Sequence, residues 1–483
     1  MELSKEPSEE WRDGYRAGFE AGVAQTGGEL ETELAALRAR VGELEVKVVE
    51  LVARTERPAK TSRNSSLPPS SDPPSAPKRA PRRPTGKKRG AQRGHPGHHR
   101  QMLDPEQVDE VIDHHPDHCP TCQMPLSVEL PDALPPIRQQ VWELPKVKPI
   151  VTEHRQHTVE CPNCQAVVKA PESEMPREGF GPRATALVGV LHGRFRLSHR
   201  ETQGVLKVVG GLSVSLGGVV GLCQETAEAL AETYAEIAER VRSESVVNVD
   251  ETSWRQAGKR PWIWTMVGSR ATLFQVLTRR NSDSLRELLG ADYLGTVISD
   301  RYSAYKCLSL DKRAICWSHL KRDFQSFVDL GEQTSEWGKG LLQIEQAVFR
   351  EWHRFRDGQI DRAGLLEALN PTQVRMRELL EEGLKRSQSE GFCRDLLKLW
   401  PALWTFAERE GVEPTNNAAE QALRPVVLWR KGCFGAVSDW GNKFVERILS
   451  LSATCRQQGL DLLDTVVNAL AAWRLANPQP HLA

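Results

Sequence analysis

Five short strand-like runs between residues 246 and 316 limit the fold more than any other feature of this sequence. They are residues 246–252, 261–268, 271–278, 295–300 and 312–316. Ser269 and Arg270 make a tight hairpin between the second and third runs, and a short helical segment, 282–289, precedes the fourth. A helix through His319 and Phe324 follows the fifth run. We therefore expect an α/β core built around one sheet.

A meander of three strands followed by strand, helix and strand is the order of the RNase H-like fold. In that order the first and fourth strands are neighbours, so Asp250 and Asp300 should meet at adjacent strand ends. Because side chains alternate between the faces of a strand, Glu251 should point away from Asp250. Two converging carboxylates suit Mg²⁺ (or Mn²⁺), which prefers oxygen ligands. Holding two such ions for attack at phosphorus needs a third acid.

Glu420 is the candidate for this third acid. It lies in a segment, residues 414–425, whose Asn416 or Asn417 can cap a helix. Arg424 lies one turn after Glu420 on the same face, and Lys431 follows just beyond. The alternative is an ordinary Glu–Arg pair on a helix surface. The position of Glu420 after the fifth strand and a long helical excursion, 329–413, favours the metal-binding interpretation.

Two Cys-x-x-Cys pairs indicate a metal module before the core. Cys119, Cys122, Cys161 and Cys164 can supply four thiolates to one tetrahedral Zn²⁺. Residues 141–144 and 154–159 alternate like short strands, as in a zinc ribbon. The gap between the pairs is longer than the usual motif. A redox role for the pairs is weaker, because there are two copies and no adjacent βαβ pattern.

The charge distribution points to a nucleic-acid partner, although the formal net charge is +0. Residues 78–100 contain many Lys and Arg and no acid, including Lys87, Lys88, Arg89 and Arg93. Within a stretch rich in Pro and Ser, these cations would neutralise phosphates without reading sequence. The alternative is a solvated linker.

The N-terminal segment carries a heptad pattern typical of a coiled coil. The apolar positions are Leu30, Leu34, Leu37, Val41, Leu44, Val48 and Leu51. Val at two of the a positions with Leu at every d position favours a parallel two-stranded coil, and Glu33 would face Arg38 of the partner. The alternative is an amphipathic helix packed on its own chain.

Two further helical segments flank the core. Residues 200–208 and 214–223, joined by a glycine turn, could form a helix-turn-helix or an ordinary helical hairpin. Aromatic residues in the excursion 329–413 recur at helical spacing, and such residues more often form core than a base-stacking surface.

At 483 residues the chain is long enough for several domains. We expect a coiled-coil helix over 1–56, a basic linker over 57–105, a zinc module over 106–175 and a helical DNA-binding region over 180–245. A catalytic core over 246–435 and a C-terminal helical tail over 436–483 follow. No run is long and apolar enough for a membrane span, the N-terminus is no signal peptide, and the scattered cysteines indicate a reducing cytoplasm.

The chain resembles the DDE transposases of the insertion sequence sixty-six family over nearly its whole length. The resembling stretches are residues 62–66, 90–97, the two cysteine pairs, 249–252, 299–305, 316–320 and 416–425. The resemblance implies a leucine-zipper start, a zinc-binding module and an RNase H-like core with a helical insertion. It also implies that Asp250, Asp300 and Glu420 form the metal-binding triad. One departure is Arg301, where many relatives have Gly, a change that is tolerable only at negative φ.

The resemblance implies metal-dependent cutting of mobile-element ends and their joining to target DNA, by a dimer or higher oligomer associated with the nucleoid. Accessory proteins could take part. The alternatives are a nuclease of the same fold, which would cut but never join, and a zinc-dependent DNA-binding regulator. The presence of all three acids argues against the regulator.

Overall fold

One mixed sheet organises the centre of the chain. Its strands lie in the order β5-β4-β3-β6-β7. The elements concerned are β3 (Val246–Ser253), β4 (Trp262–Val267), β5 (Thr272–Leu277), β6 (Thr296–Ser299) and β7 (Arg313–Ile315). β3, β4 and β5 form an antiparallel meander, whereas β6 runs parallel to both β3 and β7. The expected α/β class, strand positions and neighbouring first and fourth strands are all found.

This computed structural model describes residues 9–55, 60–65, 72, 100–171 and 179–482. Within 9–55 it describes the side chains of 9–22 and 33–48. The described chain divides into two compact units. One contains Ala235–Arg430. The other contains the described residues between Pro77 and Tyr234 and those from Lys431 onward.

Two helices flank the strands in the order expected. α6 (Ser282–Leu289) begins where the Asn281 side chain accepts a hydrogen bond from the Ser284 N–H, and it buries Leu285 and Leu288. α7 (Trp317–Asp329) follows β7 directly and buries Trp317, whose indole N–H donates to the Leu403 carbonyl. The helical character of 282–289 and of the segment through His319 is therefore confirmed.

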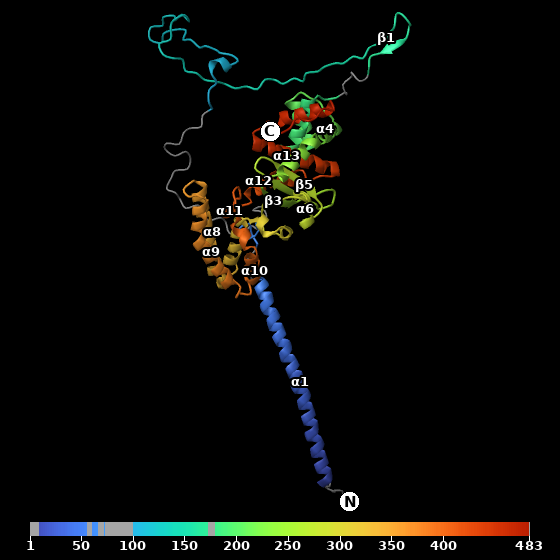
Figure 1. The fold of residues 1–483 in the computed structure, drawn as a ribbon, viewed down its shortest axis with the longest axis vertical. Coiled ribbons are helices and arrows are strands. Elements are labelled where there is room, and N and C mark those ends of the chain that lie inside the picture. Colours follow the sequence, from blue (N-terminus) through green and yellow to red (C-terminus); the bar gives the residue numbers. More distant parts are fainter. Residues whose placement is uncertain (1–8, 56–59, 66–71, 73–99, 172–178, 483) are drawn as a thin grey trace. The chain divides into compact units, whose positions relative to one another are not determined.

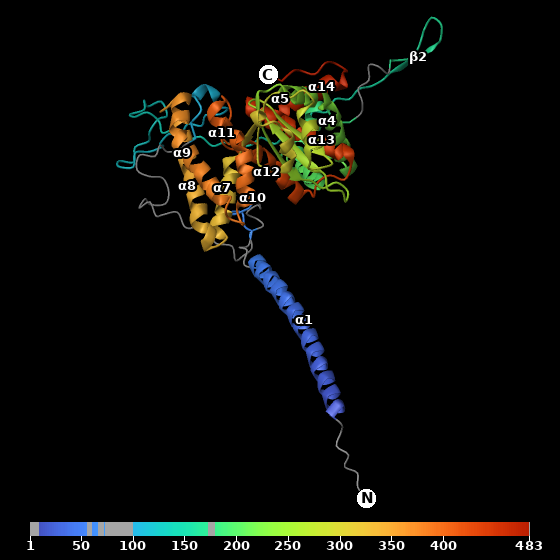
Figure 2. The same cartoon turned by 60° about the horizontal axis from the view of Figure 1, so that its bottom comes forward.

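The excursion after β7 is a helical bundle. Its helices are α8 (Glu332–Arg356), α9 (Arg362–Gly383), α10 (Glu390–Lys398) and α11 (Trp400–Glu408). α7, α8 and α9 lie side by side (Figure 1 and Figure 2). Trp337, Trp404 and Phe406 are buried in the shared core, and Trp352 packs against it. The prediction that these aromatic residues form core is confirmed. α12 (Asn417–Gly432) then follows.

The other unit is mainly helical. It contains α2 (Pro182–Gly193), α3 (His199–Val208), α4 (Leu216–Ala229), α13 (Asp439–Gln458) and α14 (Leu462–Arg474). α2 and α4 contact each other, α13 contacts α4, and α14 contacts α2. The two expected helices around residues 200–223 are present, and the C-terminal helices α13 and α14 contact α4. α5 (Ala231–Arg242) leads from this unit into the sheet.

The segment with the cysteine pairs has little regular structure. A hairpin of β1 (Thr158–Glu160) and β2 (Val167–Lys169) surrounds the second pair. The strand prediction for 141–144 is wrong, because no neighbouring segment pairs with it, and Val141 and Leu144 are exposed. Alternation of apolar residues does not by itself supply the hydrogen-bonded neighbour that a strand requires.

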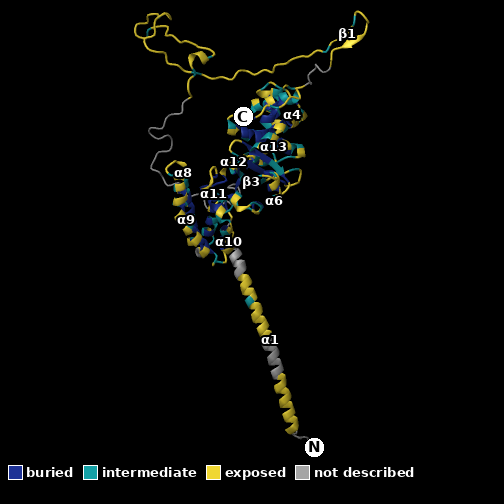
Figure 3. Cartoon of the chain, in the orientation of Figure 1, coloured by how far each residue is buried: buried dark blue, intermediate teal, exposed yellow. Residues whose placement is uncertain are grey.

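α1 (Glu9–Thr55) is one long helix. Figure 3 shows its described side chains almost wholly exposed. None of the described helices combines the length and apolar character needed to cross a membrane.

Candidate metal and active site

Asp250 and Asp300 lie at the same edge of the sheet. In the parallel pairing of β3 with β6, Val246 is opposite Thr296 and Asn248 is opposite Ile298. Continuing this register by two residues sets Asp250, within β3, level with Asp300, the residue after β6. The observed strand pairing therefore supports the prediction that the two aspartates lie side by side.

Backbone N–H groups orient both carboxylates. One oxygen of Asp250 accepts a hydrogen bond from the Glu251 N–H at 2.9 Å. One oxygen of Asp300 accepts from the Tyr302 N–H at 2.8 Å, in a turn immediately after β6. Arg301, between them, does not have positive φ, so the loss of the family's Gly introduces no left-handed strain. Arg301 instead donates to Asp323 of α7 at 2.7 Å.

The first turn of α12 is attached to β3 by Asn416. This fully buried side chain donates to the Val249 carbonyl at 2.8 Å and accepts from the Asn248 amide at 3.0 Å. Its backbone N–H donates to the Cys316 sulfur at 3.2 Å. The side chain thus links two elements, whereas the sequence suggested a helix cap. Glu420 follows one turn later, with its N–H donating to the Asn416 carbonyl.

Glu420 belongs electrostatically to the same site as the two aspartates. Burial raises the pKa of Asp250 well above its ordinary value, and the negative charges of Glu251, Asp300 and Glu420 raise it further. Among the described residues, however, the close group of potential metal ligands here holds Glu420 with Cys316 and His319 and neither aspartate, so the donor atoms of all three acids do not converge within 4.8 Å. Carboxylates at such a site repel one another unless protons or cations neutralise them.

Two residues of α7 lie beside Glu420, and neither was among the site residues predicted from the sequence. His319 Nδ1 lies 3.6 Å from one Glu420 oxygen, and Arg322 lies 3.8 Å from the other. Both the His319 Nδ1 and the nearer Glu420 oxygen are buried without a hydrogen-bond partner. Cys316, His319 and Glu420 place one potential ligand atom each within 4.8 Å of one another. The i, i+3 spacing of Cys316 and His319 was the available signal.

Arg424 and Lys431, expected to line the site, are both exposed on α12. The side chains beside Glu420 are those of His319 and Arg322. Arg430 contacts the end of β3 instead, where it donates to Thr252 at 3.2 Å and to Ser253.

Glu251 has a separate and buried environment. Arg280 donates to one of its oxygens at 2.7 Å, and Tyr305 donates to the other at 2.5 Å. Burial raises the pKa of Glu251, and the Arg280 charge opposes the rise. Arg280 also stacks over the Tyr302 ring, 3.6 Å from its centroid. Glu251 is thus engaged by other partners, as expected from its opposite direction on β3.

The two cysteine pairs adopt the same local turn. In the first, the Gln123 N–H donates to the Cys119 carbonyl, and in the second the Gln165 N–H donates to the Cys161 carbonyl. Both glutamines have positive φ, 62° and 60°. Backbone N–H groups lower the pKa of Cys119 and of Cys161. Among the described residues, the close groups of potential metal ligands do not include these cysteines, so the structure does not bring the two pairs together.

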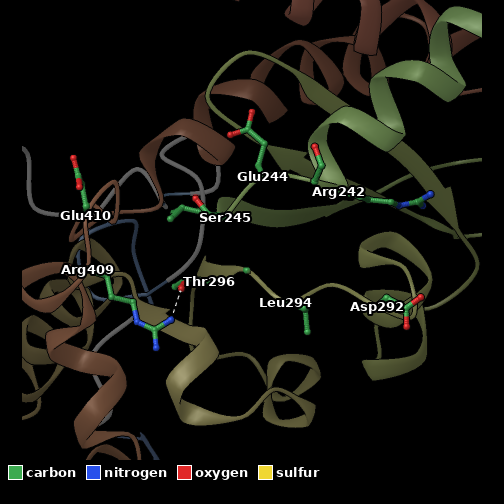
Figure 4. A pocket seen from close by; sticks show the side chains of 11 residues that line it. Arg242, Glu244, Ser245, Asp292, Leu294, Thr296, Arg409 and Glu410 are labelled. Atoms are coloured by element: carbon green, nitrogen blue, oxygen red, sulfur yellow. Dashed lines mark hydrogen bonds between the residues drawn. The ribbon is translucent and has the colours of Figure 1, made fainter.

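Four candidate DNA-binding residues, Lys87, Lys88, Arg89 and Arg93, lie outside the described residues. A recess of about 510 Å³ lies at the opposite end of β3 and β6 from the acids, beside Val246 and Thr296. Figure 4 shows Arg409 reaching Thr296 there, with Glu410 and Glu244 nearby. This mixed-charge recess is distinct from the carboxylate site.

Comparison with known proteins assigns the family. The model of the family described as "Transposase IS66 family" matches residues 178–443, which include the sheet, the helical bundle and all three acids. The chain belongs to the IS66 transposase family. The resemblance predicted from the sequence motifs is therefore confirmed. A second model, described as a family of unknown function (DUF6444), matches residues 22–101 of this IS66-family chain.

Two curated relatives of this IS66-family chain come from Sinorhizobium fredii. Uncharacterized protein y4qI is 26% identical over 274 residues, which cover 50% of this chain and 50% of the relative. Uncharacterized protein y4hP is 24% identical over 375 residues, which cover 69% of this chain and 67% of the relative. The chain thus spans about half the length of y4qI in that match.

Proposed function

We propose that this protein is a DNA transposase that cuts the ends of a mobile element and joins them to target DNA. Asp250, Asp300 and Glu420 would carry the reaction. The observation that supports this most is geometric: Asp250 and Asp300 are level on β3 and β6, and Asn416 bonds the start of α12, which carries Glu420, to β3, in a chain of the IS66 family. The strand order β5-β4-β3-β6-β7 supports an RNase H-like core.

The three acids fit divalent metal ions. Their donor atoms are carboxylate oxygens, which suit Mg²⁺ or Mn²⁺. Glu420 has a buried oxygen without a hydrogen-bond partner, and burial disfavours the ionised form of Asp250 until a cation compensates it. Bound divalent ions would polarise the phosphate and ease loss of a proton from the attacking hydroxyl.

The chain's own residues would hold the ions and the DNA. Asp250 and Asp300 are kept in place because each carboxylate accepts a hydrogen bond from a backbone N–H, of Glu251 and of Tyr302 respectively. Asn416 keeps the start of α12 against β3. In cutting, a water oxygen bonds to phosphorus and the bond to the 3′-oxygen breaks, which leaves a 3′-hydroxyl. In joining, that hydroxyl attacks a target phosphodiester and a target 3′-hydroxyl leaves.

The N-terminal helix would bring two copies together. Leu34, Leu37, Val41, Leu44 and Val48 are each about half exposed on α1, which agrees with a seam that a second chain covers. Leu30 and Leu51 lie outside the described side chains. Dimerisation would let one complex hold two element ends, with the basic arm neutralising phosphates of double-stranded DNA.

The cysteine pairs would bind one Zn²⁺ through four thiolates. Their identical turns and lowered pKa values at Cys119 and Cys161 suit thiolate ligands, and the sparse regular structure of 100–171 suits a module that a metal orders. In the full-length protein, Cys122→Ser should lower the zinc content by one ion per chain, whereas Cys307→Ser, at a half-buried cysteine outside the pairs, should not. Unchanged zinc in Cys122→Ser would refute this site.

The function can be tested with a DNA fragment that carries the element's own ends, target DNA and Mg²⁺. We expect cut and joined products from the parent protein. Asp250→Asn, Asp300→Asn and Glu420→Gln should each abolish both products while binding to the ends persists. Asp283→Asn, a matched change at an exposed acid paired with Arg286, should retain activity. Cutting without joining would indicate a nuclease, and binding alone by the parent protein a regulator.

A further inference from the structure

Three potential metal ligands converge in the helical unit, which does not contain the three acids. His192 lies at the end of α2, His199 is the first residue of α3, and Cys223 lies in the middle of α4. One ligand atom of each lies within 4.8 Å of the others. The two imidazole rings are 4.2 Å apart between centroids. Cys223 is completely buried.

The surroundings of the ring nitrogens fit metal binding. Nδ1 of His192 lies 2.7 Å from the Leu197 carbonyl, so it carries the proton and Nε2 keeps its lone pair. A backbone carbonyl in this position is the usual orienting partner of a metal-binding histidine. Nε2 of His199 is buried without a hydrogen-bond partner. Burial has removed the hydrogen bonds of this nitrogen to water, and no protein group replaces them.

Packing of the helices holds the cluster in place. Gly189, one turn before His192, allows α2 to approach Thr226, which lies one turn after Cys223; a Cβ at Gly189 would come within 2.7 Å of Thr226. Ser198 and Glu201 form a reciprocal cap that fixes the start of α3, where His199 lies. The three ligands therefore come from three helices whose mutual positions are set by close contacts.

We propose that His192, His199 and Cys223 bind one Zn²⁺ ion, separate from the cysteine-pair site and from the carboxylate site. Two imidazoles and one thiolate match the nitrogen and sulfur ligands of zinc, which would leave a fourth position for water or another group. The ion would tie the end of α2 and the start of α3 to α4. It would thereby stabilise the helical segment that the sequence marks as a possible DNA-binding element.

The protonation states of the three residues fit this role. Burial lowers the pKa of His192 to about 4 and also lowers the pKa of His199, so both rings are neutral ligands near pH 7. Burial raises the pKa of Cys223 to about 12, so its thiol keeps its proton in the absence of metal.

The test uses the full-length protein in which Cys119, Cys122, Cys161 and Cys164 are all replaced by Ser. This background removes the other thiolate site and leaves the helical unit intact. We expect it to retain one Zn²⁺ per chain after dialysis, and to show a cysteine-to-cobalt absorption band when Co²⁺ replaces Zn²⁺. Adding Cys223→Ser should remove both signals. Adding His199→Asn should lower the affinity for Co²⁺ at least tenfold.

The matched control is Cys455→Ser in the same background. Cys455 is also buried in the helical unit, with its sulfur 3.8 Å from the Thr465 hydroxyl, and its loss should leave the metal content unchanged. Circular dichroism checks that each variant folds. His199 is partly exposed, so its replacement should disturb folding less than replacement of the buried Cys223. Absence of bound zinc and of the cobalt band in the four-serine protein would overturn the proposal, as would metal binding that persists in folded Cys223→Ser.

Discussion

The Asn416 side chain donates to the backbone carbonyl of Val249 at 2.8 Å, and this bond sets the start of α12 beside the residue that precedes Asp250. Val249 and Asn416 are 167 positions apart in the chain, and the buried Asn416 amide holds their two segments together. The position of Glu420 relative to Asp250 therefore depends on a side chain that need not touch DNA or metal.

Replacing Asn416 should uncouple Glu420 from the aspartates. Asn416→Ala removes the hydrogen bond to the Val249 carbonyl and the one from the Asn248 amide, at a cost of about 0.5–1.5 kcal/mol for each bond. We expect lower stability in urea unfolding and loss of cutting even where the protein folds. Asn417→Ala, at the exposed neighbouring position, should change neither measurement. Equal activity of the two variants would contradict this role.

The Arg280–Glu251 pair should contribute mainly to stability. Arg280→Met leaves the buried Glu251 carboxylate without its counter-charge, which costs about 3–5 kcal/mol. Arg286→Met, which breaks an exposed pair with Asp283, should cost less than about 1 kcal/mol. Urea unfolding of both variants measures the difference. Adding Glu251→Gln to Arg280→Met should restore part of the loss, and no restoration would show that Glu251 is not the group affected.

Local sequence patterns predicted the sheet and the two aspartates well. Strand-like runs, the Ser269–Arg270 hairpin and the acids at strand ends are properties of neighbouring residues, so one sequence displays them. The order of the runs then implied that Asp250 and Asp300 meet. Glu420 could be proposed only because its motif and its place after the bundle agreed with the family resemblance.

Contacts between distant segments could not be predicted in the same way. His319 and Arg322 approach Glu420 from α7, and Arg424, one turn after Glu420 on α12, is exposed. Helical spacing predicts which side chains share a face but not which element covers that face. The failure of the strand at 141–144 has a related cause, because alternation does not supply a pairing partner.

His319 should act as a positioning residue for Glu420. Its Nδ1 is 3.6 Å from one carboxylate oxygen of Glu420, and Arg322 lies near the other oxygen. We expect His319→Ala to reduce the rate of end cutting at least tenfold and to raise the Mg²⁺ concentration needed for half-maximal rate, without weakening DNA binding. His353→Ala, at an exposed histidine of α8, serves as the control. A changed DNA affinity with an unchanged Mg²⁺ requirement would contradict a positioning role.

The α1 seam should determine the oligomeric state. Leu37→Glu combined with Leu44→Glu places two charges at positions that face the partner in a parallel coil. We expect the full-length double variant to sediment as a smaller species than the parent protein. Ala39→Glu with Val46→Glu has the same spacing on the outer face, where Val46 is exposed, and should leave association unchanged. A parent protein that sediments as a monomer at micromolar concentration would rule out the zipper.

Asp250 should lower the stability of the metal-free protein at neutral pH. Its pKa is raised by burial and by the charges of Glu251, Asp300 and Glu420, so the folded state binds its proton more tightly than the unfolded state does. The resulting penalty is absent well below the ordinary value of 3.8 and grows as the pH rises toward and through the raised pKa.

Asp250→Asn should therefore raise the melting temperature at pH 7 in the presence of chelator, by about 2–4 °C for each kcal/mol relieved. The gain should vanish near pH 3, and Mg²⁺ should stabilise the parent protein more than the variant. A lower melting temperature for Asp250→Asn without metal, beside an unchanged Asp283→Asn, would show that the carboxylate is already neutralised by a partner other than a bound cation.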